Sequence, residues 1–323
     1  MKILIVKLSS LGDVVHAMPA VQDIRRAYPQ AQIDWVVERG LVPLVRRCEG
    51  VGRVIGCELR RWRTSPFTSE TRRAWRSFKA ELQRDQYDAV IDLQGLTKSA
   101  LISWLAPLAP LGKRFGMANQ TEGSSFEAPA RWLADVAITL PTHIHAVARS
   151  RALCARALGY SVPAHQSFGL QADTASRRNV VALVHGTSRT DKQWPVSYWH
   201  ALGKRLNEQG YGVALPHGSD EELKCAQQIA GGLDDATVWP RLGLDSLTDA
   251  LAQCAGVVGV DSGLSHIAVA LKLPHVQLYN FDTAWRTGPP ASAGQCSVFA
   301  APTPSVDAVW QAWQCVSTEG KLP

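Results

Sequence analysis

Short apolar runs recur along the chain and are followed by stretches in which apolar positions repeat every three or four residues. In the first half, the runs at 3–6, 33–37 and 89–92 predict strands, and the periodic stretches predict helices over 14–27 and from Gly95 to Leu105. The runs are continuously apolar, as in strands covered on both faces. The first half is therefore predicted to be an α/β unit with a parallel sheet.

The same pattern begins again in the second half. Gly, Ser, Pro and His interrupt the helical pattern at 159–172, between the two halves. We expect two doubly wound domains, residues 1–165 and 166–323. The strands predicted in the second domain are 180–185, 212–216, 257–261 and 276–279, and the helices are 197–209, one that begins near Leu264, and one around 305–317 whose apolar positions are Val306, Val309, Trp310, Trp313 and Val316.

The composition is that of an ordinary globular protein. Of 323 residues, 46% are hydrophobic and 19% are charged, which excludes disordered, collagen-like and coiled-coil classes. No apolar run approaches the roughly 18 residues that span a bilayer, and the apolar start is too short for a signal peptide, so we expect a cytoplasmic protein. The seven cysteines are odd in number and lack CxxC spacing, which predicts buried, reduced thiols.

The charge is unevenly distributed. Residues 1–170 hold 23 Lys and Arg against 14 Asp and Glu, a net charge of +9, whereas residues 171–323 hold 11 against 14, a net charge of −3. The segment from Arg39 to Arg84 alone carries 12 basic and 4 acidic side chains. Such a segment favours an anionic partner, which could be nucleic acid, a membrane surface or a phosphorylated or carboxylated substrate. A solvated arginine-rich helix face is the plain alternative.

The loop after the first predicted strand opens into a helix at Gly12, Asp13 and His16. It lacks the GxGxxG fingerprint, and the Asp13 carboxylate would repel a pyrophosphate at that helix start, so this unit is not expected to hold a nucleotide. Asp13 could be catalytic, or it could cap the helix, a role that Asp favours. His16 could be a core histidine.

A phosphate-binding turn is predicted in the second half instead. The strand at 257–261 runs into Ser262 and Gly263 at a helix start, where free backbone N–H groups and the helix dipole suit a diphosphate, although any strand-to-helix turn favours small residues. Glu221 and Glu222 follow another strand, at a place where an acid can accept a hydrogen bond from a ribose hydroxyl.

No metal site is indicated, because the sequence has no HExxH, no DxD at a strand end and no Cys/His quartet. Without a metal, the neutralisation of a bound phosphate group would be left to the protein. The charges available for this are Lys192, which follows the hydroxyls of Thr187 and Ser188 after a predicted strand, and the helix start at Ser262.

Five segments together resemble the lipopolysaccharide heptosyltransferases of glycosyltransferase family 9, over nearly the whole chain. They are Lys7-x-Ser9-Ser10-x-Gly12-Asp13-x-x-His16, Arg60-Arg61-Trp62-Arg63, Ile91-Asp92-x-Gln94-Gly95-x-x-Lys98-Ser99, Asp191-Lys192-x-Trp194-Pro195 and Val260-Asp261-Ser262-Gly263-Leu264-Ser265-His266. The second and third segments are most similar to the type I members, which add the first heptose to Kdo-lipid A. Ser262 stands where Thr is usual, and 279–283 lacks the usual Gly-Pro-Thr.

The resemblance implies a GT-B fold, in which two Rossmann-like doubly wound α/β domains face each other across a cleft. It implies an inverting, metal-independent transfer of L-glycero-D-manno-heptose from ADP-heptose to a Kdo residue of Kdo-lipid A, in lipopolysaccharide inner-core biosynthesis. The resemblance also implies no cofactor, no nucleic-acid partner, and a peripheral position on the cytoplasmic face of the inner membrane.

The resemblance further implies roles for particular residues. Asp13 would be the general base that removes the proton of the acceptor hydroxyl, and Lys192 would act on the donor phosphates. The donor would also be bound by Thr187, Ser188, Glu222, Asp261, Ser262, Gly263 and His266, and the acceptor by Ser10, Gly12, Arg60, Arg61, Arg63 and Lys98.

Two other interpretations of the sequence remain open. A type II heptosyltransferase or a related core transferase would have the same fold and another acceptor, and an acceptor with fewer anionic groups would need fewer arginines. A noncatalytic polyanion or nucleic-acid binder would use the segment 39–84, whose aromatic residues include Trp62, Phe67 and Trp75. Such a binder would have no reason to select ADP.

Overall fold

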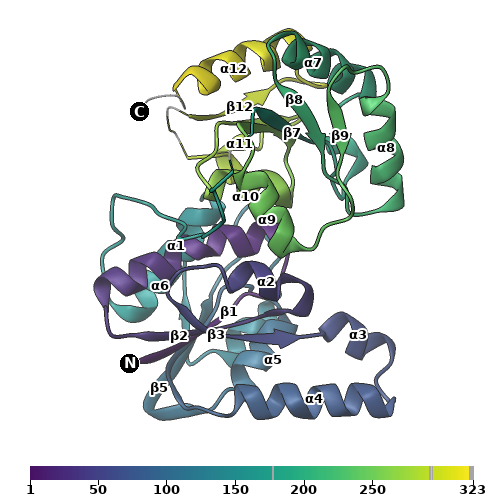
Figure 1. The fold of residues 1–323 in the computed structure, drawn as a ribbon. Helices are drawn as coiled ribbons and strands as arrows, with labels where there is room; N and C mark the ends of the chain where they lie inside the picture. The colour runs from purple at the N-terminus through teal and green to yellow at the C-terminus, as the bar shows by residue number, and fades with distance from the viewer. Residues whose placement is uncertain (177, 291, 293, 320–323) are drawn as a thin grey trace. The chain divides into compact units, whose positions relative to one another are not determined.

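The computed structural model of the protein describes residues 1–176, 178–290, 292 and 294–319. The chain divides into two compact units, the first comprising Met1–Leu170 and the second beginning at Gln171. Each unit is built on a six-stranded sheet whose strands are all parallel (Figure 1). The prediction of two doubly wound parallel-sheet units is therefore confirmed.

The sheet of the first unit has the strand order β3-β2-β1-β4-β5-β6. Its strands are β1 (Lys2–Val6), β2 (Gln32–Glu38), β3 (Val51–Cys57), β4 (Tyr87–Asp92), β5 (Leu108–Met117) and β6 (Val136–Ile138). Its helices are α1 (Leu11–Ala27), α2 (Val42–Val45), α3 (Leu59–Thr64), α4 (Ser69–Leu82), α5 (Thr97–Leu105) and α6 (Ala146–Leu158), with the 3-10 turns η1 (Arg39–Leu41) and η2 (Ala128–Leu133).

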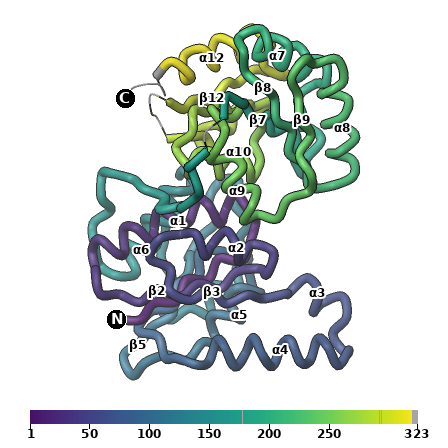
Figure 2. The backbone as a smooth tube through the Cα atoms, viewed as in Figure 1, coloured from purple at the N-terminus to yellow at the C-terminus, as the bar shows by residue number. Residues whose placement is uncertain are grey.

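Helices cover both faces of this sheet, which explains why its central strands are continuously apolar. In β1, all residues from Ile3 to Val6 are fully buried. On one face α6 lies beside α1 (Figure 2). On the other face Trp62, Phe78 and Leu82 of α3 and α4 pack against Leu4 and Val6. Trp62, Phe78 and Leu82 of the basic segment thus form part of the core, and most of its arginines are left to the surface.

The sheet of the second unit has the order β12-β11-β10-β7-β8-β9. Its strands are β7 (Val180–Val184), β8 (Gly212–Leu215), β9 (Ala236–Val238), β10 (Gly256–Val260), β11 (His275–Tyr279) and β12 (Gln295–Phe299). Its helices are α7 (Val196–Glu208), α8 (Asp220–Ala230), α9 (Leu244–Ala252), α10 (Gly263–Ala270), α11 (Ala284–Thr287) and α12 (Val306–Glu319), with the 3-10 turn η3 (Thr190–Lys192). Trp313 of α12 is buried in the core with Trp194 and Trp199.

Three local features differ from the sequence-based expectation. The strands β3, β5, β6, β9 and β12 are not among those predicted, because they lie at or near the sheet edges and are interrupted by polar or half-exposed residues. Helix α1 begins at Leu11, earlier than predicted, so Ser10 is its N-cap and Asp13 its third residue. The seven cysteines are free, but Cys315 is exposed, so the expectation that all are buried is wrong.

The strand orders place one crevice in each unit. In the first unit the chain adds strands outward from β1 in one direction and from β4 in the other, so the strand order reverses between β1 and β4. In the second unit the strand order reverses between β7 and β10. Ligands of open α/β sheets bind outside the carboxyl ends of the strands at such a reversal. The loops after β1 and β4, and those after β7 and β10, are therefore where the topology favours functional residues.

The buried His275 of β11 predicts a loss of stability in acid. Burial lowers its pKa to about 4, while Nδ1 lies 2.9 Å from the Val257 carbonyl oxygen. Between about pH 6.5 and pH 4, His275 is protonated in the unfolded chain but neutral in the folded chain. The free energy of unfolding therefore falls as the pH is lowered, and this group accounts for about 3 kcal/mol of the fall.

Urea unfolding at a series of pH values checks this expectation. His275→Asn keeps a donor for Val257 and should show a smaller fall between pH 6.5 and pH 4, whereas His165→Asn, at an exposed position, should behave like the parent. An equal fall in all three proteins would contradict the assignment.

Candidate active site

The loop after β1 is held in place by an amide side chain from the loop after β4. Oε1 of Gln94 accepts hydrogen bonds from the backbone N–H groups of Leu8, at 3.1 Å, and of Ser9, at 3.2 Å. Main-chain donors that would otherwise be unpaired are thus satisfied, and the start of α1 is fixed relative to the sheet. This locates the residues from Ser10 to Asp13 at the crevice of the first unit.

The carboxylate of Asp13 is held between donors and cations. Oδ2 accepts from the N–H of Ser10, at 3.2 Å, and from its hydroxyl, at 2.9 Å. Oδ1 lies 3.7 Å from Lys7 Nζ and 3.6 Å from Arg149 Nη2, and the side chain remains 36% exposed. Burial opposes ionisation of this carboxyl, but Lys7, His16 and Arg149 outweigh it and hold the pKa of Asp13 below its usual value. Asp13 is therefore an accessible, ionised carboxylate at neutral pH.

The two cations beside Asp13 are buried, and one of them, Arg149, comes from a distant part of the chain. The Lys7 side chain is 3% exposed and its Nζ donates to the Leu93 carbonyl at 3.2 Å. Burial lowers the pKa of Lys7. Arg149 lies on α6, and its Nη1 donates to the Thr121 hydroxyl at 3.1 Å. Sequence reasoning gave Lys7 no role and missed Arg149, which approaches Asp13 only through the packing of α6 beside α1.

Asp92 builds the turn that carries Gln94. Its carboxylate accepts from the N–H groups of Gln94, at 2.8 Å, and Gly95, at 3.2 Å, and from the Ser99 hydroxyl, at 2.9 Å. Burial raises the pKa of Asp92 to about 6, although these hydrogen bonds favour the ionised form. Gly95 has a φ of +74°, and a Cβ there would lie 2.3 Å from a Met117 methyl carbon, so glycine is required. The motif around Asp92 thus serves the loop after β1.

The acceptor-binding candidates of the basic segment fall into two groups. Arg61 is paired with Glu58, at 3.4 Å, and with Glu70. Arg60 and Lys98 are exposed, and their charges lower the pKa of Glu38 against the larger effect of burial, which raises it. Arg63 is exposed and makes no ion pair within the described part of the chain. Arg60, Arg63 and Lys98 are therefore the cations most available to an anionic ligand.

In the second unit, an ion pair joins the two loops of the crevice. Lys192 Nζ donates to Asp261 Oδ2 at 2.5 Å, and Asp261 Oδ1 lies 3.4 Å from His266 Nε2. Burial opposes the charge on Asp261, but His266 and Lys192 outweigh it and hold the pKa of this carboxyl below its usual range. The structure thus brings together three residues that the sequence placed in the donor site, with Asp261 as the group that orients the other two.

A pocket of about 440 Å³ is lined by the loops after β7 and β8. The loop after β7 also carries Lys192. Thr187 and Glu222 lie in the wall of the pocket together with His185. The Glu222 carboxylate accepts from the Gly218 N–H at 2.6 Å, and a Cβ at Gly186 would lie 2.4 Å from Glu222 Oε1. The volume is within the range of ligand sites, and a carboxylate beside hydroxyl and imidazole groups suits a ribose. Ser188 is exposed on the same loop as Thr187.

The start of α10 offers unpaired donors. Ser262 is the N-cap of this helix and Gly263 its first residue, and the Ser262 hydroxyl is buried without a hydrogen-bond partner among the described atoms. The first N–H groups of a helix have no intrahelical acceptor and attract anions. The arrangement fits a diphosphate, as the sequence predicts, and serine supplies the hydroxyl of the usual threonine.

Sequence reasoning missed Asn280, which lies at the end of β11. Its Nδ2 donates to the carbonyl oxygens of Asp191, at 2.9 Å, and Gln193, at 3.0 Å, while its Oδ1 accepts from the Thr303 hydroxyl at 2.7 Å. Asn280 therefore fixes the turn that carries Lys192, in the segment that lacks the usual Gly-Pro-Thr. An amide directly after a buried strand was the available sign.

The described residues show neither a metal-binding cluster nor a membrane-spanning helix. They contain no cluster of three or more His, Cys, Asp or Glu side chains suited to a metal ion. None of the helices within the described ranges combines the length and apolar character needed to cross a bilayer.

The fold is that of the GT-B glycosyltransferases. The solved E. coli heptosyltransferase WaaC with ADP matches this chain with a TM-score of 0.87 and 33% identity, over 96% of this chain and 98% of that chain. The same enzyme with ADP-2-deoxy-2-fluoro heptose matches with a TM-score of 0.83, at the same identity and coverage. Residues 75–309 match the glycosyltransferase family 9 (heptosyltransferase) profile, and the chain belongs to that family.

Curated relatives separate two types of heptosyltransferase. Lipopolysaccharide heptosyltransferase 1 of Pseudomonas aeruginosa is 39% identical over 284 residues, which cover 86% of this chain and 78% of that protein. Lipopolysaccharide heptosyltransferase 2 of E. coli K12 is 27% identical over 294 residues, which cover 86% of this chain and 82% of that protein. The chain is thus more similar to the type 1 enzyme, which confirms the resemblance noted in the sequence.

Proposed function

We propose that this heptosyltransferase moves L-glycero-D-manno-heptose from ADP-heptose to a Kdo residue of Kdo-lipid A, in lipopolysaccharide inner-core biosynthesis. The similarity to lipopolysaccharide heptosyltransferase 1 and to WaaC with ADP-2-deoxy-2-fluoro heptose supports this donor and this pathway. The lower identity to the type 2 relative disfavours the alternative acceptor. The reaction is inverting and needs no metal, and the protein acts peripherally at the cytoplasmic face of the inner membrane.

The observation that carries the proposal is the ionised Asp13 at the crevice of the first unit. In a single displacement, the acceptor oxygen attacks the anomeric carbon while a base removes its proton, and the bond from that carbon to the ADP oxygen breaks. Asp13 is exposed enough to reach the hydroxyl and is held ionised by Lys7 and Arg149. It therefore accepts the proton, and Ser10 keeps its carboxylate oriented.

Donor binding belongs to the second unit. The ribose fits the pocket at Glu222, and the diphosphate fits the start of α10 and the ammonium of Lys192. When the departing ADP gains negative charge, Lys192 can shift its hydrogen bonding from Asp261 toward the phosphate oxygens. The ammonium of Lys192 and the N–H groups at the start of α10 then stabilise the developing charge in place of a metal ion.

Release of ADP tests the proposal. The purified protein, ADP-heptose and de-acylated Kdo-lipid A are incubated in EDTA, and ADP is measured together with the anomeric configuration of the product. We expect ADP release that requires both substrates and an inverted product. Activity only with a heptosylated acceptor would favour the type II reading, and activity restored by Mg²⁺ or Mn²⁺ would contradict the metal-free mechanism.

The basic segment predicts a specific effect on the acceptor. Arg60→Ala or Arg63→Ala should raise the acceptor KM by about 10- to 100-fold, since each loses a charge-assisted contact to a carboxylate or phosphate worth about 1.5 to 3 kcal/mol. The donor KM should barely change. Arg61→Ala should have a smaller effect, because Glu58 and Glu70 already occupy its guanidinium.

Steady-state kinetics with each substrate varied in turn check this expectation. Arg26→Ala, on the last turn of α1, removes an exposed arginine elsewhere in the same unit and serves as the control. Added salt should weaken acceptor use less in the Arg60 and Arg63 variants than in the parent. Equal damage to both substrates would instead mean that these arginines support the fold.

A further inference from the structure

The turn between α3 and α4 exposes a large aromatic side chain. Phe67 is 88% exposed and lies at the end of the helical hairpin formed by α3, the turn 65–68 and α4 (Figure 1). The turn is ordered by Thr68, whose hydroxyl accepts from the Thr71 N–H at 3.2 Å. A phenyl ring at such a position contributes nothing to the core and is available to another surface.

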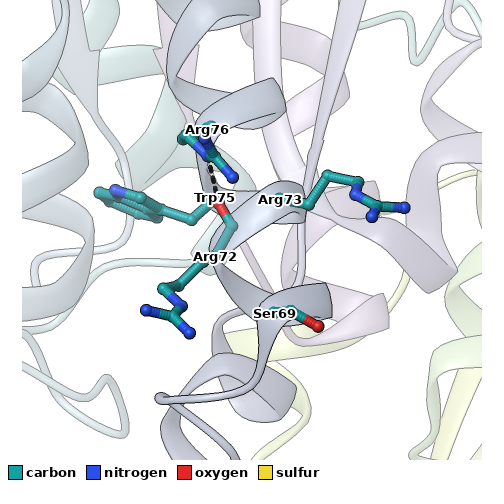
Figure 3. Close-up of a pocket in the computed structure, with 5 residues that line it drawn as sticks. All are labelled: Ser69, Arg72, Arg73, Trp75 and Arg76. Carbon is teal, nitrogen blue, oxygen red and sulfur yellow. Dashed lines mark hydrogen bonds between the residues drawn. The ribbon is translucent and has the colours of Figure 1, made fainter.

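The outward side of α4 carries arginines that lack acidic partners. Arg72, Arg73, Trp75 and Arg76 line a surface hollow of about 490 Å³ together with Ser69. Figure 3 shows the side chains of Arg72 and Arg73 extending from α4 in different directions. The three guanidinium groups make no ion pair with any described residue; the only side-chain bond among them runs from Arg76 Nε to the Arg72 carbonyl oxygen, at 3.3 Å. The one acid at the start of α4, Glu70, is taken by Arg61.

The opposite face of α4 fixes this basic surface to the first unit. Phe78 and Leu82 are buried in the core, and Trp75 is half-buried against Trp62, with ring centroids 5.3 Å apart and planes at 87°. Because Trp62 and Trp75 pack against each other, they are not free to stack on nucleic-acid bases. The exposed side of the hairpin thus combines unpaired arginines with a single free aromatic ring at its tip.

We propose that the turn 65–68 and the outward side of α4 dock on an anionic phospholipid surface, with Phe67 entering the headgroup region and Arg72, Arg73 and Arg76 binding phosphate oxygens. Basic surfaces with an apolar tip bind anionic membranes in this way. The proposal deepens the proposed function, because it assigns the peripheral membrane position to these residues, and in that respect it rests on it. The occupant is the phospholipid headgroup layer, not the acceptor.

Co-sedimentation with vesicles tests the surface. The full chain is mixed with vesicles of phosphatidylcholine alone or with phosphatidylglycerol, without acceptor or donor. Binding should require phosphatidylglycerol and weaken with added salt. The triple variant Arg72→Gln, Arg73→Gln, Arg76→Gln should bind about 10²-fold more weakly, since each basic side chain near an anionic surface contributes about five-fold. Phe67→Ser should weaken binding about ten-fold, because it removes most of the apolar area that would be buried.

Matched variants in the second unit serve as controls. Arg241→Gln removes an exposed arginine and Phe299→Ser an exposed phenylalanine, and both should bind vesicles like the parent. Vesicle binding that is unchanged in the hairpin variants, or lost equally in the controls, would overturn the proposal. So would an anionic oligonucleotide that binds through the same arginines while the vesicles do not bind.

A second readout separates this proposal from the proposed function. The hairpin variants should release ADP from ADP-heptose and de-acylated Kdo-lipid A at the parental rate, because Phe67 and the α4 arginines are not part of the reacting site. If ADP release is normal and vesicle binding is the same in the variants as in the parent, the membrane-docking proposal is rejected and the proposed function is not. Vesicle binding that follows the variants, in a protein without heptosyltransferase activity, would reject the proposed function alone.

Discussion

Asp13→Ala should lower kcat by about 10²- to 10⁴-fold and leave the donor KM nearly unchanged. This is the usual contribution of a general base, and Asp13 is the ionised carboxylate at the crevice of the first unit. The loss should appear in kcat because the proton moves only when the acceptor oxygen attacks. Steady-state ADP release, with each substrate varied at saturating amounts of the other, measures both quantities.

Asp13→Asn distinguishes catalysis from helix capping. The amide oxygen can still accept from the Ser10 N–H, as the carboxylate does at 3.2 Å, so the start of α1 should be kept. We expect this variant to fold and to be as inactive as Asp13→Ala. The control is Asp88→Asn, an exposed aspartate of β4 that accepts from the Lys2 N–H at 2.6 Å. Normal turnover in Asp13→Asn would leave Asp13 as a cap only.

Lys192→Ala should reduce kcat/KM for ADP-heptose by about 10²- to 10³-fold. The ammonium is the cation placed by η3 and Asn280 at the donor crevice, and removing one fixed donor from a developing oxyanion has this magnitude in other enzymes. Lys192→Arg, which keeps the charge, should lose much less. Kinetics with ADP-heptose varied measure the effect, and Lys204→Ala, an exposed lysine of α7, is the matched control.

The ion pair with Asp261 calls for one more variant. Without Lys192, the buried Asp261 carboxylate loses a partner 2.5 Å away, so the single variant could fail for structural reasons. The double variant Lys192→Ala, Asp261→Asn removes the carboxylate charge that has lost this partner and should recover thermal stability. Activity should stay low in the double variant if Lys192 acts on the donor. Recovery of activity along with stability would reduce Lys192 to a structural partner of Asp261.

The approximate positions of the candidate active-site loops could be read from the sequence, but the contacts that hold them could not. The loops after β1 and β10 follow continuous apolar runs and contain Gly and Ser at a helix start, and such patterns are local. Gln94 and Asn280 each anchor a loop from the end of another strand, across 85 or more residues of chain. An amide in such a position has no local periodicity that separates it from any surface amide.

The basic segment 39–84 likewise has features that the sequence predicts and features that only the structure shows. Its excess charge is a property of the sequence, and Trp75, Phe78 and Leu82 recur at the spacing of one helix face, which packs into the core in the structure. Which arginines remain free depends on the positions of the acids. Glu58 and Glu70 occupy Arg61, and Asp34 and Asp85 occupy Arg53, whereas α4 keeps its arginines unpaired.

The sequence by itself determined the class of fold, two parallel α/β units, because strands buried on both faces must be continuously apolar and amphipathic helices must repeat every three to four residues. Its motifs also determined the family. Only the tertiary structure decided the electrostatics of Asp13. Lys7 reaches it from the loop after β1, and Arg149 reaches it only because α6 packs beside α1. Electrostatic effects act through space, and the separation of Arg149 from Asp13 along the chain does not indicate this contact.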